Sequence, residues 1–368
     1  MPSERIDYDL HGLVGIRLID AAPRDAAAVD RQLGPLQGNL DREPDIVIRF
    51  VDRLSLSSTP RLVGLDDAAY TDDAFLVLRS KYKARARVQI PLDRVGRSCE
   101  IVCERGVPAV PLLVPIINLT ALGNDAVALH ASAFQYRGMD ALVTGWAKGG
   151  KTEALLAFMR NGASYIGDEW VYLADGGRRM VGLPEPIKLW DWHLSQVPEY
   201  RSRVGWRDRA RLGGLASVTR LARGARQGGG PRAMMRRAMP LIERQLFVHL
   251  APERLFGEAA CRAGGTPERI FFVVSHASER VTVEPIDSDE VAARMAFSLH
   301  HERLDLVAYY LKFRFAFPER RNDLLDHVTE REHQQLARML KGRPSYIVRH
   351  PYPIPVAALF DAMAPHLS

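Results

Sequence analysis

The feature that most constrains this chain is a glycine-rich stretch, Gly145-Trp-Ala-Lys-Gly-Gly-Lys-Thr152, which fits the pattern G-x-x-x-x-G-K-[ST]. Such a loop binds an anion where a strand turns sharply into the N-terminus of a helix, because several backbone N–H groups then point at one place. The alternating stretch ALVTG precedes the motif, and EALLAFMR, with helical periodicity, follows it. This pattern predicts an α/β fold with a phosphate-binding loop at a strand–helix junction.

Each fixed position of the motif has a chemical task. The glycines permit the left-handed backbone conformations that a tight phosphate-binding turn needs. Lys151 is expected to reach the β- and γ-phosphates of a nucleoside triphosphate, and the Thr152 hydroxyl to bind Mg²⁺. We therefore expect ATP and Mg²⁺ to bind here. The predicted nucleotide-binding residues are Gly145, Trp146, Ala147, Lys148, Gly149, Gly150, Lys151, Thr152 and Glu153.

Two acidic residues, Asp168 and Glu169, end the next predicted strand, Ala163–Gly167. We expect that strand beside the one that carries the loop, so that both carboxylates lie at the same edge of the sheet. Phosphoryl transfer to a hydroxyl needs a proton acceptor and ligands for Mg²⁺. Asp168 is predicted to be the base and Glu169 a metal ligand, with the two roles open to exchange, and the predicted metal ligands are Thr152, Asp168 and Glu169. His130, in the strand before the loop strand, is either a core residue or a neighbour that sets the pKa of Asp168.

The stretch HASAF…YRGMDALVTGWAKGGKTEALLAFMRNGASYIGDEWVYL resembles the catalytic core of the HPr kinase/phosphorylase family. It also resembles the wider group of phosphate-loop kinases related to ATP-dependent phosphoenolpyruvate carboxykinase. The shared order is a His in a strand, a loop that ends Gly-Lys-Ser/Thr-Glu, a helix, and a strand that ends in two acids. The resemblance implies a P-loop kinase core with Asp168, His130 and Lys151 as its catalytic residues, in which Asp168 prepares a serine hydroxyl and His130 lies beside it.

The chain departs from this family at two positions of the motif region. Lys148 stands where glycine is common, and Glu169 stands where Asp is common. The family's segment for the reverse, phosphorolytic reaction is not found, which argues against phosphorylase activity and against HPr itself as the acceptor. The related kinases phosphorylate serine on carrier proteins, serine in peptide natural products, or small hydroxyl compounds, and this sequence does not choose among them.

Three functions follow from these residues. The first is an ATP-dependent kinase that transfers the γ-phosphoryl group to a hydroxyl acceptor. The second is a nucleotide-binding regulatory protein without transfer, against which the intact Lys151, Thr152 and Asp168 argue. The third is an ATPase, which usually carries an apolar strand ending in Asp downstream of the loop. Here the downstream strand RIFFVVSH ends in Ser275 and His276 instead.

The remainder of the chain sets the predicted domains. Residues 1–120 are predicted to form an N-terminal α+β domain, and residues 121–368 the P-loop kinase domain with a mainly helical C-terminus. Within the second, residues 201–237 hold eleven Arg and a single acid, Asp208, and are interpreted as an insertion or lid made of broken helical pieces. Three other elements are expected: a helix near 240–250, a strand pair in RIFFVV and RVTVEPI, and one long helix in SDEVAARMAFSLHHERLDLVAYYLKF.

Composition limits location and partners. Hydrophobic residues make up 47% of the chain, and the net charge of +6 suits phosphorylated ligands without selecting one. The charged N-terminus and the proline-interrupted apolar run Val107–Leu122 predict a cytoplasmic protein without a membrane span. The Arg-rich segment has few aromatic residues, which argues against single-stranded nucleic acid as a partner. A homo-oligomer is left open. The three cysteines, Cys99, Cys103 and Cys261, are too few for a disulfide framework.

Overall fold

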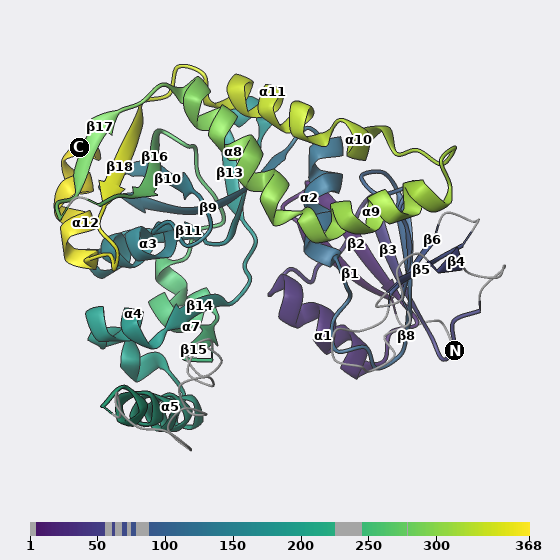
Figure 1. Ribbon diagram of the computed structural model, residues 1–368, viewed down its shortest axis with the longest axis horizontal. Coiled ribbons are helices and arrows are strands. Elements are labelled where there is room, and N and C mark those ends of the chain that lie inside the picture. Colours follow the sequence, from purple (N-terminus) through teal and green to yellow (C-terminus); the bar gives the residue numbers. More distant parts are fainter. Residues whose placement is uncertain are drawn as a thin grey trace.

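Alternating apolar stretches form two large mixed sheets, each covered by helices (Figure 1). The computed structural model describes residues 5–55, 61–62, 68–71, 75–78, 88–224, 245–277 and 279–368. Both sheets combine parallel and antiparallel neighbours, so the chain has the predicted α/β class in its general form.

The first sheet has eight strands in the order β1-β2-β3-β8-β7-β6-β5-β4. Its central pairs, β2–β3 and β3–β8, are parallel, and its other pairs are antiparallel. The expected strands near 13–18, 46–51 and 75–78 are all confirmed. The strand bounds are β1 Arg5–Leu10, β2 Val14–Ile19, β3 Ile46–Val51, β4 Arg61–Leu62, β5 Ala68–Tyr70, β6 Phe75–Leu78, β7 Val88–Pro91 and β8 Cys99–Glu104.

The second sheet carries the glycine-rich loop and has the order β13-β12-β9-β10-β16-β18-β17, with β11 also paired to β9. The loop strand β10 is parallel to β16, and β16 is parallel to β18. The predicted strands RIFFVV and RVTVEPI exist, but β17 pairs with β18 rather than with β16. The bounds are β9 Val127–Tyr136, β10 Met139–Gly145, β11 Ser164–Gly167, β12 Trp170–Ala174, β13 Arg179–Gly182, β16 Arg269–Ser275, β17 Thr282–Pro285 and β18 Ser345–His350.

The long strand β9 explains where the acidic pair lies. Its first half pairs with β12, with His130 opposite Trp170, and its second half pairs with β11, with Phe134 opposite Tyr165. Asp168 and Glu169 form the short break between β11 and β12. The prediction that the strand of the acidic pair lies directly beside the loop strand is therefore wrong, because β9 runs between β11 and β10.

The two faces of the second sheet belong to different apolar cores, since successive side chains on a strand point to opposite faces. Leu142 and Phe272 face the larger core, which is continuous with that of the first sheet and includes residues of α2, α8 and α11. Val143 and Val273 face a second core that contains residues of α3 and α12. The helix bounds are α1 Pro23–Leu33, α2 Leu113–Gly123, α3 Lys151–Arg160, α4 Asp191–Gln196, α5 Trp206–Gly224, α7 Pro252–Phe256, α8 Ser288–Glu302, α9 Leu304–Ala316, α10 Asp323–Asp326, α11 Val328–Leu340 and α12 Val356–Met363.

The single long helix expected in the C-terminal part is broken into α8 and α9. At Arg303 the backbone leaves helical geometry, with φ −102° and ψ 12°, and the guanidinium is buried against Glu332 of α11. After this break α9 packs on the first sheet, and Asn322 donates hydrogen bonds to the carbonyls of Leu92 and Val95. The C-terminal part is mainly helical, as predicted, but it also contributes the strand β18 to the second sheet.

A small two-stranded sheet, β14 Ile187–Trp190 with β15 Phe247–Leu250, lies with α4, α5 and α7 below the second sheet (Figure 1). The prediction of a helix near 240–250 is wrong for the residues that the structure describes there, since Phe247–Leu250 form β15. The Arg-rich segment is not broken at Gly213–Gly214 but contains the continuous helix α5, which Arg211 joins to the carbonyls of Gln245 and Phe247. The rest of that segment, 225–237, lies outside the described residues, and its role as an insertion or lid stays a prediction.

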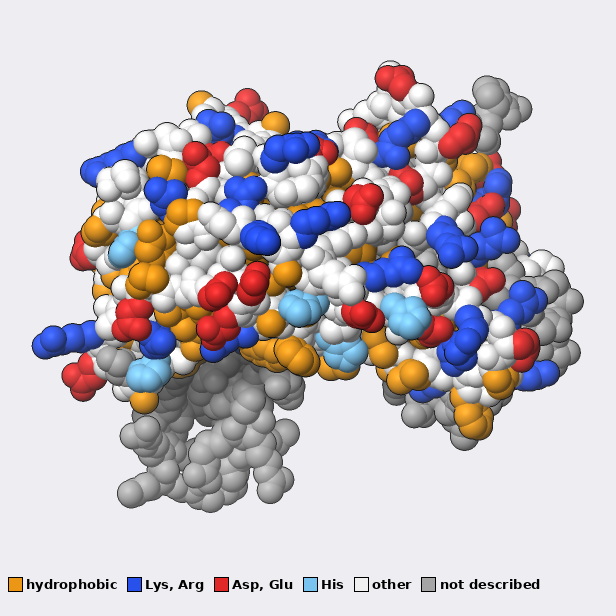
Figure 2. Space-filling model, turned by 90° about the horizontal axis from the view of Figure 1, so that it is seen from above, with side chains coloured by type: hydrophobic (Ala, Val, Ile, Leu, Met, Phe, Trp, Pro, Cys, Tyr) orange, Lys and Arg blue, Asp and Glu red, His pale blue; other side chains and the backbone are white. Residues whose placement is uncertain are grey.

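Among the described residues, no helix has both the length and the apolar character needed to cross a membrane. Seen from above, over α8, α9 and α11, acidic and basic side chains alternate without a broad area of one sign (Figure 2). That face therefore offers no basic stripe of the kind that follows a nucleic acid backbone.

Candidate functional site

The glycine-rich loop joins β10 to α3, as predicted, and its backbone requires glycine at two positions. Gly145 has φ 154° and Gly150 φ 107°. A Cβ at Gly145 would lie 2.5 Å from the Val273 carbonyl oxygen, and one at Gly150 would lie 2.9 Å from His350 Nε2. Lys148 also has a left-handed conformation, with φ 61°. A lysine held there costs about 1 kcal/mol, a strain typical of functional loops.

Lys151 begins α3 and turns back over the loop. Its ammonium group donates hydrogen bonds to the carbonyl oxygens of Trp146, at 2.8 Å, and Gly145, at 3.3 Å. Burial lowers the pKa of Lys151, although several nearby carboxylates oppose that shift. Within the described chain its hydrogen bonds go to neutral carbonyls, so a bound anion would add a direct charged partner to the nearby carboxylates.

Asp168 is the most deeply buried acid of this region, with 3% of its surface exposed. It accepts hydrogen bonds from Ser132 Oγ at 2.5 Å and from Thr152 Oγ1 at 3.1 Å. Burial, and next the negative charge of Glu169, raise the pKa of Asp168 to about 7, while the two hydroxyl hydrogen bonds partly oppose that rise. A carboxyl group with this pKa exchanges a proton readily near neutral pH.

His130 lies between two carboxylates. Its Nε2 is 3.0 Å from Glu169 Oε2, and its Nδ1 is 2.8 Å from Glu302 Oε1. Burial works against the protonated ring, but the hydrogen bonds to Glu169 and Glu302 outweigh it and raise the pKa of His130. The hydrogen bond to His130 lowers the pKa of Glu302. At Glu169 burial opposes ionisation, but the hydrogen bond to His130 and the positive charges of His130, Lys151 and Lys188 together outweigh it and lower the pKa. The three side chains thus favour an imidazolium between two carboxylates.

The backbone of Glu169 helps to build this arrangement. Its φ of 63° is unusual for a residue with a side chain, and it lets the chain turn between β11 and β12. The Glu169 carbonyl oxygen accepts a hydrogen bond from Ala131 N, at 3.1 Å, on the opposite strand. Asp168 and Glu169 are therefore held against the middle of β9, between Ser132 and His130.

Glu153 is engaged by a second histidine. His193 on α4 accepts a hydrogen bond at Nδ1 from Trp190 N, so its Nε2–H is free to donate to Glu153 Oε1 at 3.0 Å. Burial alone would raise the pKa of Glu153, but the hydrogen bond from His193 and smaller contributions, including the charge of Lys151, together outweigh it and lower the pKa. Lys188 lies nearby, with its ammonium 4.6 Å from the Trp190 ring and 4.2 Å from the Phe247 ring.

These groups converge on one polar cavity of about 380 Å³ above the loop. Asp168 does not line it directly but is hydrogen-bonded to Thr152, which does. Of the predicted nucleotide-binding residues, Gly145 and Trp146 are not among those that line it. The lining residues are His130, Ala147, Lys148, Gly149, Gly150, Lys151, Thr152, Glu153, Glu169, Lys188, Trp190, Trp192, His193, Glu302 and Tyr352.

Sequence reasoning missed Glu302, Ser132 and Glu185. Burial, and next the charge of Glu169, raise the pKa of Glu185 to about 8, and within the described chain its Oε1 has no hydrogen-bond partner. Glu185 lies between two prolines, Pro184 and Pro186, and no spacing rule joins it to the acidic pair. Glu302 stands 172 residues from His130, beyond the reach of any local pattern.

We compared the chain with models of known protein families and with curated proteins. No family model matches it, and no curated protein matches it.

Proposed function

We propose that this protein is a Mg²⁺-ATP-dependent phosphotransferase with a P-loop kinase core of the HPr kinase type, acting on a hydroxyl acceptor. One observation carries the proposal. The buried Asp168 carboxylate, with a pKa raised to about 7, is hydrogen-bonded to the hydroxyl of Thr152 at the end of the glycine-rich loop. A proton acceptor and a phosphate-binding loop thus meet at one point.

The proposed reaction assigns a task to each group. The loop N–H groups and Lys151 hold the phosphates, and the N-terminus of α3 adds a favourable partial charge. Asp168 accepts the proton of the acceptor hydroxyl while the oxygen of that hydroxyl forms a bond to the γ-phosphorus. The bond from that phosphorus to the bridging oxygen breaks, and ADP leaves with its electron pair. His130, held between Glu169 and Glu302, supplies a positive charge beside the acidic pair.

The oxygen donors at the loop suit Mg²⁺. Thr152, Asp168 and Glu169 offer a hydroxyl and two carboxylates, and Mg²⁺ in phosphoryl-transfer enzymes takes one or two carboxylates together with phosphate oxygens and waters. No three His, Cys, Asp or Glu side chains in the described part of the chain are grouped to hold a metal alone. This agrees with an ion that needs the nucleotide as a partner. When bound, it would neutralise phosphate charge.

The arrangement also weighs against the two other functions. β16 lies beside β10, where an ATPase would present an acid, but it ends in Ser275. A regulatory protein that only binds nucleotide would have no use for a buried carboxylate whose charge burial disfavours. These observations support transfer over hydrolysis or binding alone.

A ³¹P NMR time course tests the proposal, with purified protein, Mg-ATP and an extract of the source cells. We expect a new phosphoester signal with the wild-type protein and none with Lys151→Ala or Asp168→Asn. Asp175→Asn, an exposed acid at the far end of β12, is the matched control and should leave the signal intact. Intact ATP, or release of free phosphate alone, would refute the kinase proposal.

A further inference from the structure

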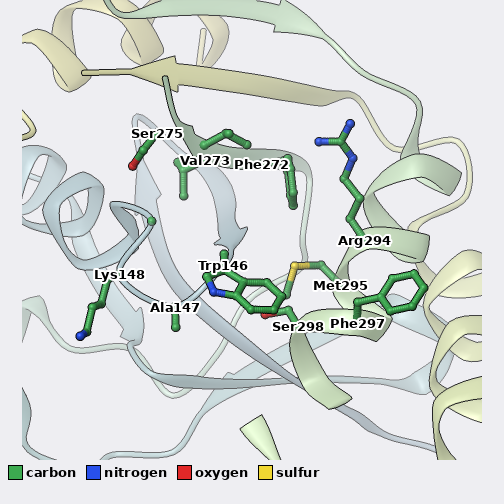
Figure 3. Close-up of a pocket in the computed structure, with 12 residues that line it drawn as sticks. Trp146, Ala147, Lys148, Phe272, Val273, Ser275, Arg294, Met295, Phe297 and Ser298 are labelled. Carbon is green, nitrogen blue, oxygen red and sulfur yellow. The ribbon is translucent and has the colours of Figure 1, made fainter. Parts of the chain in front are cut away.

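A second cavity, of about 420 Å³, opens on the same loop. Ala147, Lys148 and Gly149 line both cavities, so the loop separates the second from the polar one. Its other walls are Trp146, the end of β16 and one side of α8 (Figure 3). We call it the Trp146 pocket. It is lined by Trp146, Ala147, Lys148, Gly149, Phe272, Val273, Val274, Ser275, Arg294, Met295, Phe297 and Ser298.

Aromatic side chains at this pocket are left open to solvent. Trp146 is 51% exposed, and Phe297 is 69% exposed. One face of the Trp146 indole stacks on His301, with ring centroids 4.8 Å apart and planes at 28°. That contact fixes the ring and leaves its remaining surface to the pocket, where Met295 and Phe272 add apolar walls (Figure 3). An open, pre-formed aromatic cavity of this kind is typical of a ligand site.

A buried polar atom at the same pocket points independently to a ligand. Ser298 is only 2% exposed and lines the cavity, and within the described residues its Oγ has no hydrogen-bond partner. Buried hydroxyl groups are nearly always hydrogen-bonded, and an unpaired one costs roughly 1–3 kcal/mol. A polar atom of a ligand seated against the apolar walls would supply that partner.

The direction of the nucleotide decides which molecule this ligand belongs to. The lysine of such a loop reaches the β- and γ-phosphates. Lys151 Nζ lies at the first residues of the loop, on the carbonyls of Gly145 and Trp146. The γ-phosphate of a bound nucleotide would therefore be held on the Trp146 side of the loop, with the base directed away from it. On this orientation the Trp146 pocket would lie at the end where the acceptor enters.

We propose that the Trp146 pocket binds an aromatic or branched apolar group of the phosphoryl acceptor. The inference rests on the proposed kinase function and narrows its substrate class to amphiphilic hydroxyl compounds. Such an acceptor spans the loop at Ala147–Gly149, which lines both cavities. Its hydroxyl enters the polar cavity beside Thr152, the hydrogen-bond partner of Asp168, and its apolar group packs on Trp146 and Phe297.

The test compares two small probes that share a serine hydroxyl, N-benzoyl-L-serinamide and N-acetyl-L-serinamide. Calorimetry measures their dissociation constants with and without saturating MgADP. We expect the benzoyl probe to bind roughly tenfold more tightly, because only it buries a ring. That advantage should fall to about twofold or less in Trp146→Ala and in Phe297→Ala, whose side chain is exposed and unimportant for folding. Trp206→Ala, which removes an indole 69% exposed on α5, is the matched control and should keep the full advantage.

Equal affinities of the two probes in the wild-type protein, or an advantage that survives both pocket variants, would overturn the proposal. So would displacement of the benzoyl probe by adenosine, together with a loss of ADP affinity but not of inorganic tripolyphosphate affinity in Trp146→Ala. That result would show that the Trp146 pocket binds the adenine ring of the nucleotide instead of the acceptor. Failure of the kinase function is seen separately, as absent MgADP binding or absent transfer in the ³¹P experiment.

Discussion

The first and second sheets both bury charged side chains, but they surround them with different partners. In the first sheet region, Arg17 forms two hydrogen bonds to Asp7, of 2.7 and 2.9 Å. Asp25 accepts hydrogen bonds from the backbone N–H groups of Ala22 and Gly106. Each charge there meets a group that stabilises its charged form.

In the second sheet, burial disfavours the charged forms of several groups. It raises the pKa of Asp168 and Glu185 and lowers the pKa of Lys151. Local rules for a stable fold are broken at these three groups and kept at Arg17, Asp7 and Asp25. Such violations concentrate where a protein binds or reacts, because the missing compensation comes from the ligand. The comparison therefore supports the proposal that the second sheet gives up stability for chemistry while the first does not, and variants in each should behave differently.

The largest expected effect is a loss of turnover when Asp168, at the second sheet, is replaced. Asp168→Asn should lower the rate of phosphoryl transfer by roughly 10²- to 10⁴-fold, because an amide cannot accept the acceptor proton. Nucleotide affinity should change little, since the loop and Lys151 are intact. In the wild-type protein, kcat/KM should rise with pH through about 7, where Asp168 loses its proton. Coupled measurement of ADP release between pH 5 and pH 9 checks both points. Full turnover in Asp168→Asn would remove Asp168 from the role of base.

A core variant of the first sheet should lose stability but keep its nucleotide affinity. Phe50 in β3 is 1% exposed. Phe50→Ala should lower the unfolding free energy by about 3–5 kcal/mol, because it leaves a large cavity. The dissociation constant for MgADP should stay within about twofold of wild type. Urea unfolding and calorimetry measure the two quantities. A nucleotide affinity that falls together with stability would show that the two sheets do not act separately.

Local patterns were enough to predict the strands and helix around the loop, since Met139–Gly145 contains a short apolar run that leads into the glycine-rich loop and Lys151–Arg160 has helical periodicity. They also placed Asp168 and Glu169 at the end of a strand. They failed where distant segments decide the structure. The insertion of β9 between β10 and β11 is a choice of strand pairing, and the break at Arg303 coincides with a buried contact to Glu332 on another helix. Neither leaves a periodic trace in the sequence.

The next effect is a gain of stability at the site itself. The folded pKa of Asp168 is about 7 and its unfolded pKa is about 3.9, so the folded state binds more protons between these values and stability falls as pH rises through that range. Above about pH 7 the penalty is fully present. Asp168→Asn removes it and should raise the unfolding free energy by about 1–3 kcal/mol at pH 8, and by less at pH 5. Urea unfolding at both pH values, with Asp175→Asn as control, measures this. If Asp168→Asn destabilised the protein equally at both pH values, the charge of Asp168 would not be what lowers stability.

The smallest expected effect is a change in the pH dependence of turnover when Glu302 is altered. Glu302 is one of the two carboxylates at the second sheet that sequence reasoning missed. Glu302→Gln leaves the shape of the site but removes one of the two charges that raise the pKa of His130, so that pKa should fall. With less positive charge on His130, the charge of Glu169 acts more strongly on Asp168 and raises its pKa further. The acidic limb of the kcat/KM profile should therefore move to higher pH by up to about one unit, which is at most a tenfold loss near neutral pH.

Titration of the His130 ring by NMR gives an independent readout of this change, because a merely structural role for Glu302 would not lower the pKa of the imidazole. Glu290→Gln, on the same helix and paired with the exposed Arg294, is the matched control and should shift neither the ring titration nor the profile. If Glu302→Gln lowers turnover equally at every pH while His130 titrates as before, Glu302 supports the fold of α8 and does not set the charge of the site. If both move together, the acidic pair, His130 and Glu302 titrate as one unit, and the conflict of charges that distinguishes the second sheet extends to the C-terminal end of α8.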